Sequence, residues 1–377
     1  MLVDSAFIAF VARMPLSKAL KYALNGAFSD STIKLAVILF LIMMMEYIMR
    51  NTGMIRSMTD SLKELAGSKR LAASLLPFVI GLLPSPGGAR FSCPMVEEVV
   101  GDNADGPEKA FINYWFRHIW LDSFILYPGI ILAAELLKVS VVSLFLRLAP
   151  FMLASIVLGT IFGLTHIKKE KIKRTKPVRE SLKTFIIALL PIILVITVYI
   201  SLINVTAFPL EIASGSMVVV LLIIKKYTFK EMVKAAREAF PVKLILLIIG
   251  VMVFKEILLG SGGIISLSGL LETCGIPVAV LYLLLPFIGG LTSGLSISFV
   301  SLTFPILISL GLGSNIWFAV IAYLAGFMGN MVTPLHLCAV MTADYFKTPL
   351  GGMLKRVAVT IIPLFLAAAA VLFILAR

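Results

Sequence analysis

Four ionisable residues lie in otherwise apolar stretches of the chain and could bind a charged ligand. Arg90 follows two glycines, and Arg117, His118 and Asp122 lie close together further along. Burying a charge in apolar surroundings costs free energy, so each of these residues is a candidate for a functional role. An anion can offset an unpaired guanidinium by accepting two parallel hydrogen bonds. Two plainer interpretations stay open, namely an ion pair between Arg117 and Asp122 and a hydrated Arg90 that only anchors its segment.

Proline, glycine and hydroxyl residues interrupt the apolar stretches at four places and supply further candidate ligands. Two stretches, 71–100 and 276–310, have arms too short to cross a membrane, and each is expected to form a re-entrant helical hairpin. The other breaks, at Tyr127-Pro-Gly129 and at 329–334, interrupt the spans that follow the hairpins. A helix that begins at a break presents N–H groups to a carboxylate, and one that ends there presents carbonyl oxygens to Na⁺. A proline kink without function is the alternative for any single break.

These positions together predict one binding site near the middle of the membrane, between the hairpin tips and the breaks. His118 could carry a proton, or it could be an ordinary buried histidine. Asp122, Ser298 and Gly329 are the candidate ligands of a cation, Na⁺ or H⁺, that would be bound together with the anion as a coupling ion. The candidates for the substrate are polar, glycine and aromatic residues at the same places, namely Ser85, Gly87, Gly88, Arg90, Ser92, Arg117, His118, Tyr127, Thr292, Ser293, Gly294, Ser296, Asn330, Thr333 and His336.

The composition that surrounds these residues indicates an all-α polytopic membrane protein. Of 377 residues, 60% are hydrophobic and 14% charged, whereas soluble domains have about 25% charged residues. The net charge of +13 comes from short segments between apolar runs, so a nucleic-acid surface is not expected. Lipid admits helices or closed barrels, and the alternating pattern of a barrel is absent. The three cysteines are far apart and form no CxxC motif, so no metal site is expected.

Basic residues divide the chain and orient it in the membrane. Lysine and arginine are concentrated in 166–183 and 225–243, and the positive-inside rule puts both segments in the cytoplasm. We therefore expect a first unit over residues 1–165, a cytoplasmic basic linker over 166–183 and a second unit over 184–377. The membrane is expected to be the inner or plasma membrane, crossed several times.

A weak internal repeat relates the two units. Segment 75–82 resembles 284–291, and Tyr127-Pro matches Thr333-Pro in the same order and at nearly the same spacing. The basic residues imply that the two copies are inverted, with the first copy shortened at its N-terminus. Inverted repeats with broken helices are a mark of secondary transporters.

Three motifs resemble one family of membrane proteins. They are Leu83-Pro-Ser-Pro-Gly-Gly-Ala-Arg-Phe-Ser92, Asn113-Tyr-Trp-Phe-Arg-His118 and Leu126-Tyr-Pro-Gly129. They look like the signature of an uncharacterised integral-membrane family, numbered four hundred and one among the domains of unknown function, and the resemblance covers almost the whole chain. That family is grouped with the ion transporter superfamily of gluconate, citrate, dicarboxylate and lactate carriers. The resemblance implies a dimer, a scaffold with a moving transport domain, and coupling of an organic anion to Na⁺ or H⁺.

The residues and the resemblance together predict a secondary active transporter with elevator-type alternating access. Its substrate would be a small organic anion, with a carboxylate the favoured class, coupled to Na⁺ or H⁺. The expected partners are this anion, the lipid bilayer and a second copy of the chain. No enzyme activity is expected, and no cofactor other than a coupling Na⁺. The alternatives are a channel and a membrane-embedded enzyme that uses Ser85, Ser92 and His118 as nucleophile and base.

Overall fold

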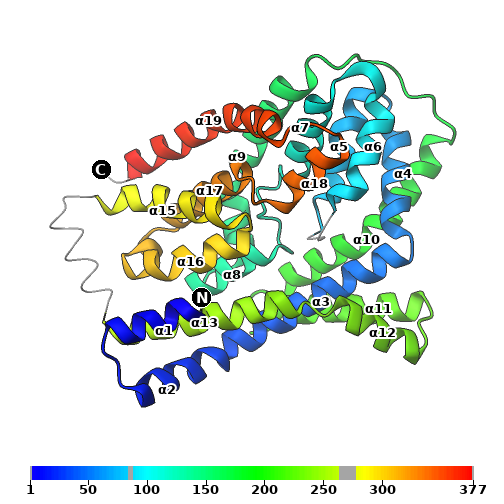
Figure 1. Ribbon diagram of the computed structural model, residues 1–377. Coiled ribbons are helices and arrows are strands. Elements are labelled where there is room, and N and C mark those ends of the chain that lie inside the picture. Colours follow the sequence, from blue (N-terminus) through cyan, green and yellow to red (C-terminus); the bar gives the residue numbers. More distant parts are fainter. Residues whose placement is uncertain (1, 84–87, 263–276, 376–377) are drawn as a thin grey trace.

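The computed structural model describes residues 2–83, 88–262 and 277–375 (Figure 1). These residues form helices joined by turns and by two longer non-helical stretches, 118–127 and 165–177, and no strand occurs among them. Their composition and length confirm the expectation of an all-helical protein with segments that can cross a membrane. Five such segments occur in the described part of the chain: Leu16–Asn51, Val141–Leu164, Val178–Leu202, Ile316–Tyr345 and Leu350–Leu375.

Helices make up most of the described part of the chain. Those before the basic linker are α1 (Leu2–Val11), α2 (Leu16–Ala27), α3 (Asp30–Asn51), α4 (Met54–Ala66), α5 (Lys69–Ile80), α6 (Ala89–Val100), α7 (Gly106–Arg117), α8 (Pro128–Leu137) and α9 (Val141–Gly159). The later helices are α10 (Val178–Leu202), which begins within the linker, α11 (Pro209–Ile224), α12 (Phe229–Ala239), α13 (Val242–Ser261), α15 (Val278–Ser293), α16 (Ser296–Ser309), α17 (Ile316–Val332), α18 (Leu337–Tyr345) and α19 (Leu350–Leu375).

Capping residues determine where several of these helices begin. The Ser29 hydroxyl accepts a hydrogen bond from the backbone N–H of Thr32 in the first turn of α3. Asp105 and Glu108 form a capping box at the start of α7. Such caps satisfy N–H groups that have no partner within the helix. The capping box therefore determines where α7 begins, whereas no such local signal marks its end, which lies within an apolar stretch.

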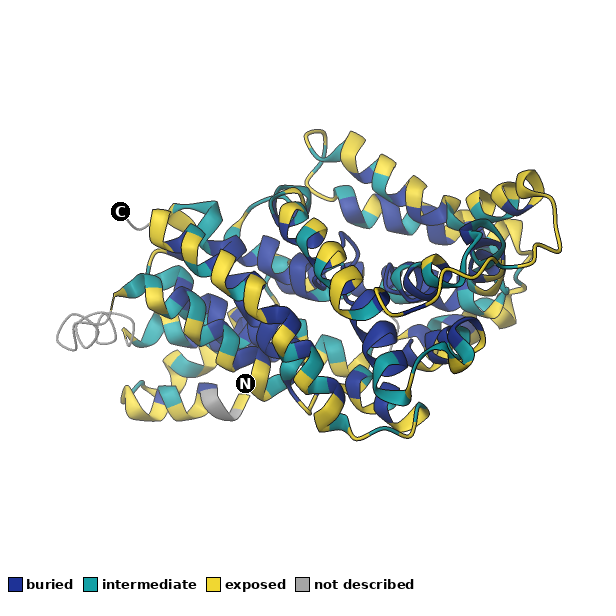
Figure 2. Cartoon of the chain, turned by 90° about the horizontal axis from the view of Figure 1, so that it is seen from above, coloured by how far each residue is buried: buried dark blue, intermediate teal, exposed yellow. Residues whose placement is uncertain are grey.

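The segment that comprises α17 and α18 lies at the centre of the molecule. In its most apolar window 78% of the residues are buried, against 28% in α10. Figure 2 shows buried residues gathered in the interior and exposed residues along the outer helices. The exposed side chains of α10 include Ile186, Ile187 and Ile200, as expected of a helix that faces lipid. Most residues of α17 are buried, whereas Leu337, Val340 and Tyr345 of α18 are exposed.

Helices from early and late parts of the chain interleave (Figure 1). Helix α8 packs against α16, and α18 packs against α6. In the same way α2 packs against α13, and α12 packs against α3. The two parts of the sequence therefore form one connected helical assembly.

The closest approach of two helices is between α15 and α17. A methyl group added at Gly290 would lie 2.0 Å from the carbonyl oxygen of Gly326. One added at Gly329 would lie 2.0 Å from the carbonyl oxygen of Phe287. Real carbon–oxygen contacts of this kind are much longer, so glycine is what allows the two backbones to touch.

The basic linker is held against α4 and α5 by polar contacts. Arg70 donates through Nε to the carbonyl oxygen of Ile167 at 2.8 Å. The Glu64 carboxylate accepts hydrogen bonds from the hydroxyl and the backbone N–H of Thr175, at 2.7 and 2.9 Å. These bonds to Thr175 stabilise the charged form and hold the pKa of Glu64 below its usual value.

We expect this end of the linker to loosen as the pH falls. Because the folded-state pKa of Glu64 is lowered, its stabilisation is present at neutral pH and is lost as acid protonates the carboxylate. A fluorophore attached to an introduced Lys176→Cys should therefore lose anisotropy in acid. The variant Glu64→Ala should show the low anisotropy at every pH, whereas the exposed control Glu180→Ala should behave as the parent protein. Anisotropy independent of pH in the parent would contradict the expectation.

Candidate functional site

A cavity of about 200 Å³ lies where two unwound stretches of chain meet. One stretch, 118–127, separates α7 from α8, and the other, 333–336, separates α17 from α18. The turn between α15 and α16 closes a third side. The lining side chains are Met43, Arg117, His118, Asp122, Tyr127, Pro128, Leu244, Gly294, Leu295, Ser296, Ile297, Asn330, His336, Leu337 and Cys338.

The first unwound stretch has a strained backbone beside the cavity. Leu121 and Asp122 have φ angles of 54° and 49°, in the left-handed region that residues with a side chain rarely adopt. The conformation costs about 1–2 kcal/mol per residue. The hydroxyl of Tyr323 donates to the carbonyl oxygen of Asp122 at 2.6 Å and helps to hold it. Strain of this kind persists at sites where a side chain must be aimed, here the Asp122 carboxylate.

A hydrogen bond joins the first unwound stretch to the last turns of α17 at the cavity. The side-chain amide of Asn330 donates to Oδ2 of Asp122 at 3.1 Å. Asn330 is fully buried and Asp122 is 6% exposed. The other amide atom, Oδ1 of Asn330, is buried without a hydrogen-bond partner among the described residues. The pair thus presents carboxylate and amide oxygens at one wall of the cavity.

Three of the described helices begin at the cavity wall. Pro128, Ser296 and Leu337 are the first residues of α8, α16 and α18, and all three line the cavity. The first turn of a helix has unpaired N–H groups and partial positive charge. Three such starts around one small space favour an anion there.

Arg117 adds a full positive charge to the same space. It is the last residue of α7, is 4% exposed, and donates from Nη1 to the Cys338 sulfur at 3.0 Å. Its guanidinium also lies against Gly88 at the start of α6, where a methyl group would stand 2.3 Å from Nη2. A planar guanidinium in this position can donate two parallel hydrogen bonds to a carboxylate.

Two histidines stand side by side across the cavity. The ring centroids of His118 and His336 are 4.8 Å apart, with the rings nearly perpendicular. The Tyr114 hydroxyl lies 3.1 Å from Nδ1 of His336, and its ring contacts both imidazoles. The two histidines are 4% and 5% exposed.

The structure brings together eight of the residues that the sequence singles out as ligands. They are Arg117, His118, Asp122, Tyr127, Gly294, Ser296, Asn330 and His336, and all line the cavity. Thr333 is buried at the second unwound stretch, where its hydroxyl accepts from the N–H of Leu335. Gly88 contacts the Arg117 guanidinium. Ser85 and Gly87 lie outside the described residues.

Other candidates lie away from the cavity. Arg90 is exposed on α6 and does not line it. The hydroxyls of Ser92, Thr292 and Ser293 each donate to the carbonyl oxygen four residues earlier. Gly329 lies in the contact between α15 and α17, and the half-buried Ser298 on α16 is not part of the lining.

Cys338 is a lining residue that the sequence reasoning missed. It lies two residues after His336, in the first turn of α18, and is half-buried. The signal was the short spacing from a histidine at a helix start, a position where a thiol meets positive charge. Tyr114 was missed as well, although it stands one helical turn before His118.

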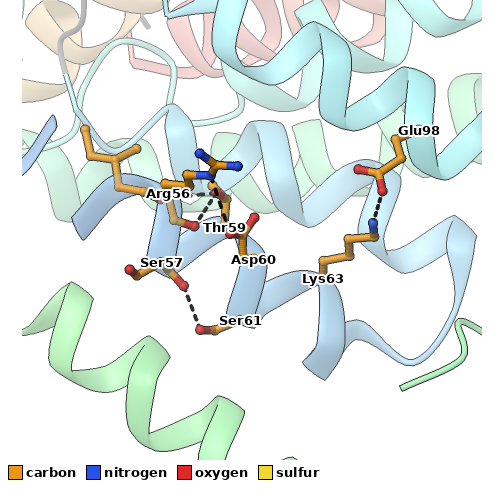
Figure 3. A network of polar contacts seen from close by, with 8 residues as sticks. Arg56, Ser57, Thr59, Asp60, Ser61, Lys63 and Glu98 are labelled. Carbon is orange, nitrogen blue, oxygen red and sulfur yellow. Dashed lines mark hydrogen bonds and ion pairs between the residues drawn. The ribbon is translucent and has the colours of Figure 1, made fainter. Parts of the chain in front are cut away.

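A larger cavity, of about 590 Å³, lies between α3, α4 and α6. Its charged side chains form local pairs: Arg50 with Glu46, and Arg56 with Asp60. Figure 3 shows the second pair on α4, with Lys63 nearby reaching Glu98 on α6. Helix starts from the two breaks meet at the smaller cavity, so the smaller cavity is the better candidate for a functional site.

Comparison with known proteins assigns a family and no activity. The family model described as a protein of unknown function (DUF401) matches residues 1–375, which include both unwound stretches and the cavity. No curated protein matches the chain.

Proposed function

We propose that this chain, which belongs to the DUF401 family of proteins of unknown function, is a secondary active transporter of a small organic anion. The observation that carries the proposal is the cavity between the two unwound stretches, which three helix starts and Arg117 surround. Discontinuous helices that point their N-termini at an anionic group are the device by which secondary transporters bind a carboxylate. A small carboxylate is therefore the proposed substrate class.

Asp122 and Asn330 are the proposed ligands of the coupling ion. Their hydrogen bond puts the Asp122 carboxylate and the Asn330 amide at one wall of the cavity. Oxygen ligands of this kind suit Na⁺, and a carboxylate in the same place could carry H⁺ instead. The ion would lie opposite the guanidinium of Arg117, so that cation and anion enter one site together.

An inverted-repeat architecture is part of the proposal. A methyl group at Gly81 would lie 2.1 Å from the carbonyl oxygen of Arg117, just as Gly290 approaches Gly326. The two pairs have the same separation along the chain. The contacts of α8 with α16 and of α18 with α6 correspond in the same way. In this arrangement the pairs α5–α6 and α15–α16 are re-entrant hairpins, and the helices that carry the cavity move as one unit against a scaffold.

The proposal includes a location in the inner or plasma membrane and assembly as a homodimer. The basic linker and the segment 225–243 would face the cytoplasm, since positive charge is retained on that side of the inner or plasma membrane. A homodimer would give the scaffold a fixed partner against which the transport unit moves. Fusion of a reporter enzyme that is active only outside the cytoplasm to position 170 should give no signal if this topology is right.

A thermal-shift screen of small carboxylates, with and without Na⁺, tests the proposal. A ligand that binds the folded protein at a hundred times its Kd stabilises it by about 2.7 kcal/mol. We expect one class of carboxylate to raise Tm and to exchange across proteoliposome membranes in counterflow. A steady leak conductance in planar bilayers, with no stabilisation by any anion, would instead indicate a channel.

A further inference from the structure

Three potential metal ligands meet at the cavity. One ligand atom from each of His118, His336 and Cys338 lies within 4.8 Å of the other two. His118 comes from the first unwound stretch, and the other two residues come from the end of the second and the start of α18. Nothing in the sequence spacing unites them, because His118 is far from the other two along the chain.

Both histidines are held in the orientation that a metal ligand requires. Nδ1 of His118 lies 2.7 Å from the carbonyl oxygen of Tyr114, and Nδ1 of His336 lies 3.0 Å from that of Asn330. A carbonyl oxygen can only accept, so a neutral ring that bonds it carries its hydrogen on Nδ1 and keeps a lone pair on Nε2. The Tyr114 hydroxyl, which also lies near Nδ1 of His336, donates to the carbonyl oxygen of Met331 at 3.2 Å and can accept from the same Nδ1–H. Metal-bound histidines are oriented in the same way, by donating the other ring N–H to a carbonyl or carboxylate.

The sulfur of Cys338 has surroundings that suit a thiolate ligand. Arg117 donates to it from Nη1 at 3.0 Å, and the residue lies in the first turn of α18. A guanidinium and a helix start both place positive charge beside the sulfur. Hydrogen bonds of this type to a ligand atom are the usual second layer of a metal site.

We infer that His118, His336 and Cys338 form a binding site for a thiophilic transition metal ion, with Zn²⁺ the best-fitting ion. Two imidazoles and one thiolate select such ions over Na⁺ or Mg²⁺, which take oxygen ligands. Zinc–nitrogen bonds of about 2.0–2.1 Å and zinc–sulfur bonds of about 2.3 Å require the ligand atoms to approach to roughly 3.5 Å. The ligand atoms already lie within 4.8 Å of one another, so the approach that the ion requires is about 1 Å.

Three protein ligands leave the fourth tetrahedral position of Zn²⁺ open. All three residues line the cavity, so the open position faces the space in which the proposed anion would lie. The charges of Arg117 and Asp122 at the cavity wall cancel. A bound Zn²⁺ and the Cys338 thiolate then give the cavity a net charge of about +1, which favours an anion. In this respect the inference extends the proposed function, although the metal site itself depends only on the three ligands.

Titration of the purified full-length protein with Zn²⁺ and Co²⁺ tests the inference. We expect one ion per chain, and for Co²⁺ a thiolate charge-transfer absorption with the visible bands of a tetrahedral ion. Cys338→Ser should abolish the charge-transfer absorption. Cys338→Ser, His118→Gln and His336→Gln should each weaken Zn²⁺ binding by about a hundredfold or more, because changing even the partners of metal ligands costs about 10–100-fold. The matched controls Cys93→Ser and His166→Gln change a buried cysteine and an exposed histidine outside the site and should bind as the parent does.

The wild-type spectrum alone can overturn the inference, so it does not depend on the folding of any variant. Absence of the charge-transfer absorption would exclude Cys338 as a ligand. If Cys338→Ser or His336→Gln leaves the affinity for Zn²⁺ unchanged, the three-residue site is excluded. Carboxylate binding by a protein that binds no Zn²⁺ would overturn the metal site and leave the proposed transporter standing. Binding of Zn²⁺ without binding of any anion would support the metal site and overturn the proposed anion transporter.

Discussion

Arg117→Lys is expected to weaken binding of the transported anion by about ten- to a hundredfold, because a charge-assisted hydrogen bond contributes about 1–3 kcal/mol. Lysine keeps the positive charge but loses the planar pair of donors that matches a carboxylate. Arg117 lines the cavity and is 4% exposed, so a loss of its paired donors acts directly on a ligand bound there. Binding is measured as the concentration of the identified carboxylate that stabilises the purified protein to half its maximal thermal shift.

Arg90→Lys is the matched control for this substitution. The sequence favours Arg90 as an anion ligand, yet the residue is exposed on α6 and lies outside the cavity lining. The same chemical change at position 90 should therefore leave the affinity almost unaltered. The Tm of both variants without ligand shows whether either change disturbs folding. Equal loss of affinity in the two variants, or loss in Arg90→Lys alone, would remove Arg117 from the proposed site.

The contrast between Arg90 and Arg117 shows what sequence patterns can and cannot predict here. Both arginines are charges in apolar stretches of the sequence, and the helical class follows from hydrophobicity. Burial, however, depends on which helices meet. Contact with Gly88 and Cys338, from α6 and α18, encloses Arg117 and leaves Arg90 at the surface. Such a meeting of distant segments has no local signal.

The end of α7 illustrates a second limit. Tyr127-Pro-Gly129 predicts a break, because proline and glycine interrupt helices. In the structure α7 already ends at Arg117, and Tyr127 and Pro128 instead start α8. The intervening backbone is unwound at Leu121 and Asp122, which have left-handed φ angles without any glycine. Tertiary contacts such as the hydrogen bond from Tyr323 hold that conformation, so propensity could not predict it.

The second break was predicted more closely, because its chemistry is local. Thr333 and Pro334 follow directly after Val332, the last residue of α17, and proline cannot donate the N–H that would continue the helix. Asn330 and His336 flank the proline within a few residues, so their arrival at one cavity follows from a single interruption. The partner of Asn330 is Asp122, which lies 208 positions away and was assigned to the coupling ion on type alone.

Gly329→Ala is expected to lower the free energy of unfolding by about 3 kcal/mol, toward the upper end of the cost of overpacking a well-packed core. The added methyl would stand 2.0 Å from the carbonyl oxygen of Phe287 and 2.9 Å from the backbone nitrogen of Leu291. Both atoms belong to the backbone of α15, so no side-chain rotation can relieve the overlap. The helices must separate instead, which breaks the contact that positions the turn between α15 and α16 beside the cavity.

Gly351→Ala is the control for that substitution, because it too changes a helical glycine but meets nothing within 4 Å. Alanine is the better helix former by up to about 1 kcal/mol, so this variant should be as stable as the parent or slightly more stable. Tm in detergent, followed by the loss of monodisperse protein on heating, compares the three proteins. The sequence also suggests Gly329 as a carbonyl ligand of the coupling ion, a role that alanine would preserve. A Gly329→Ala protein with unchanged Tm would therefore contradict the packing role of this glycine.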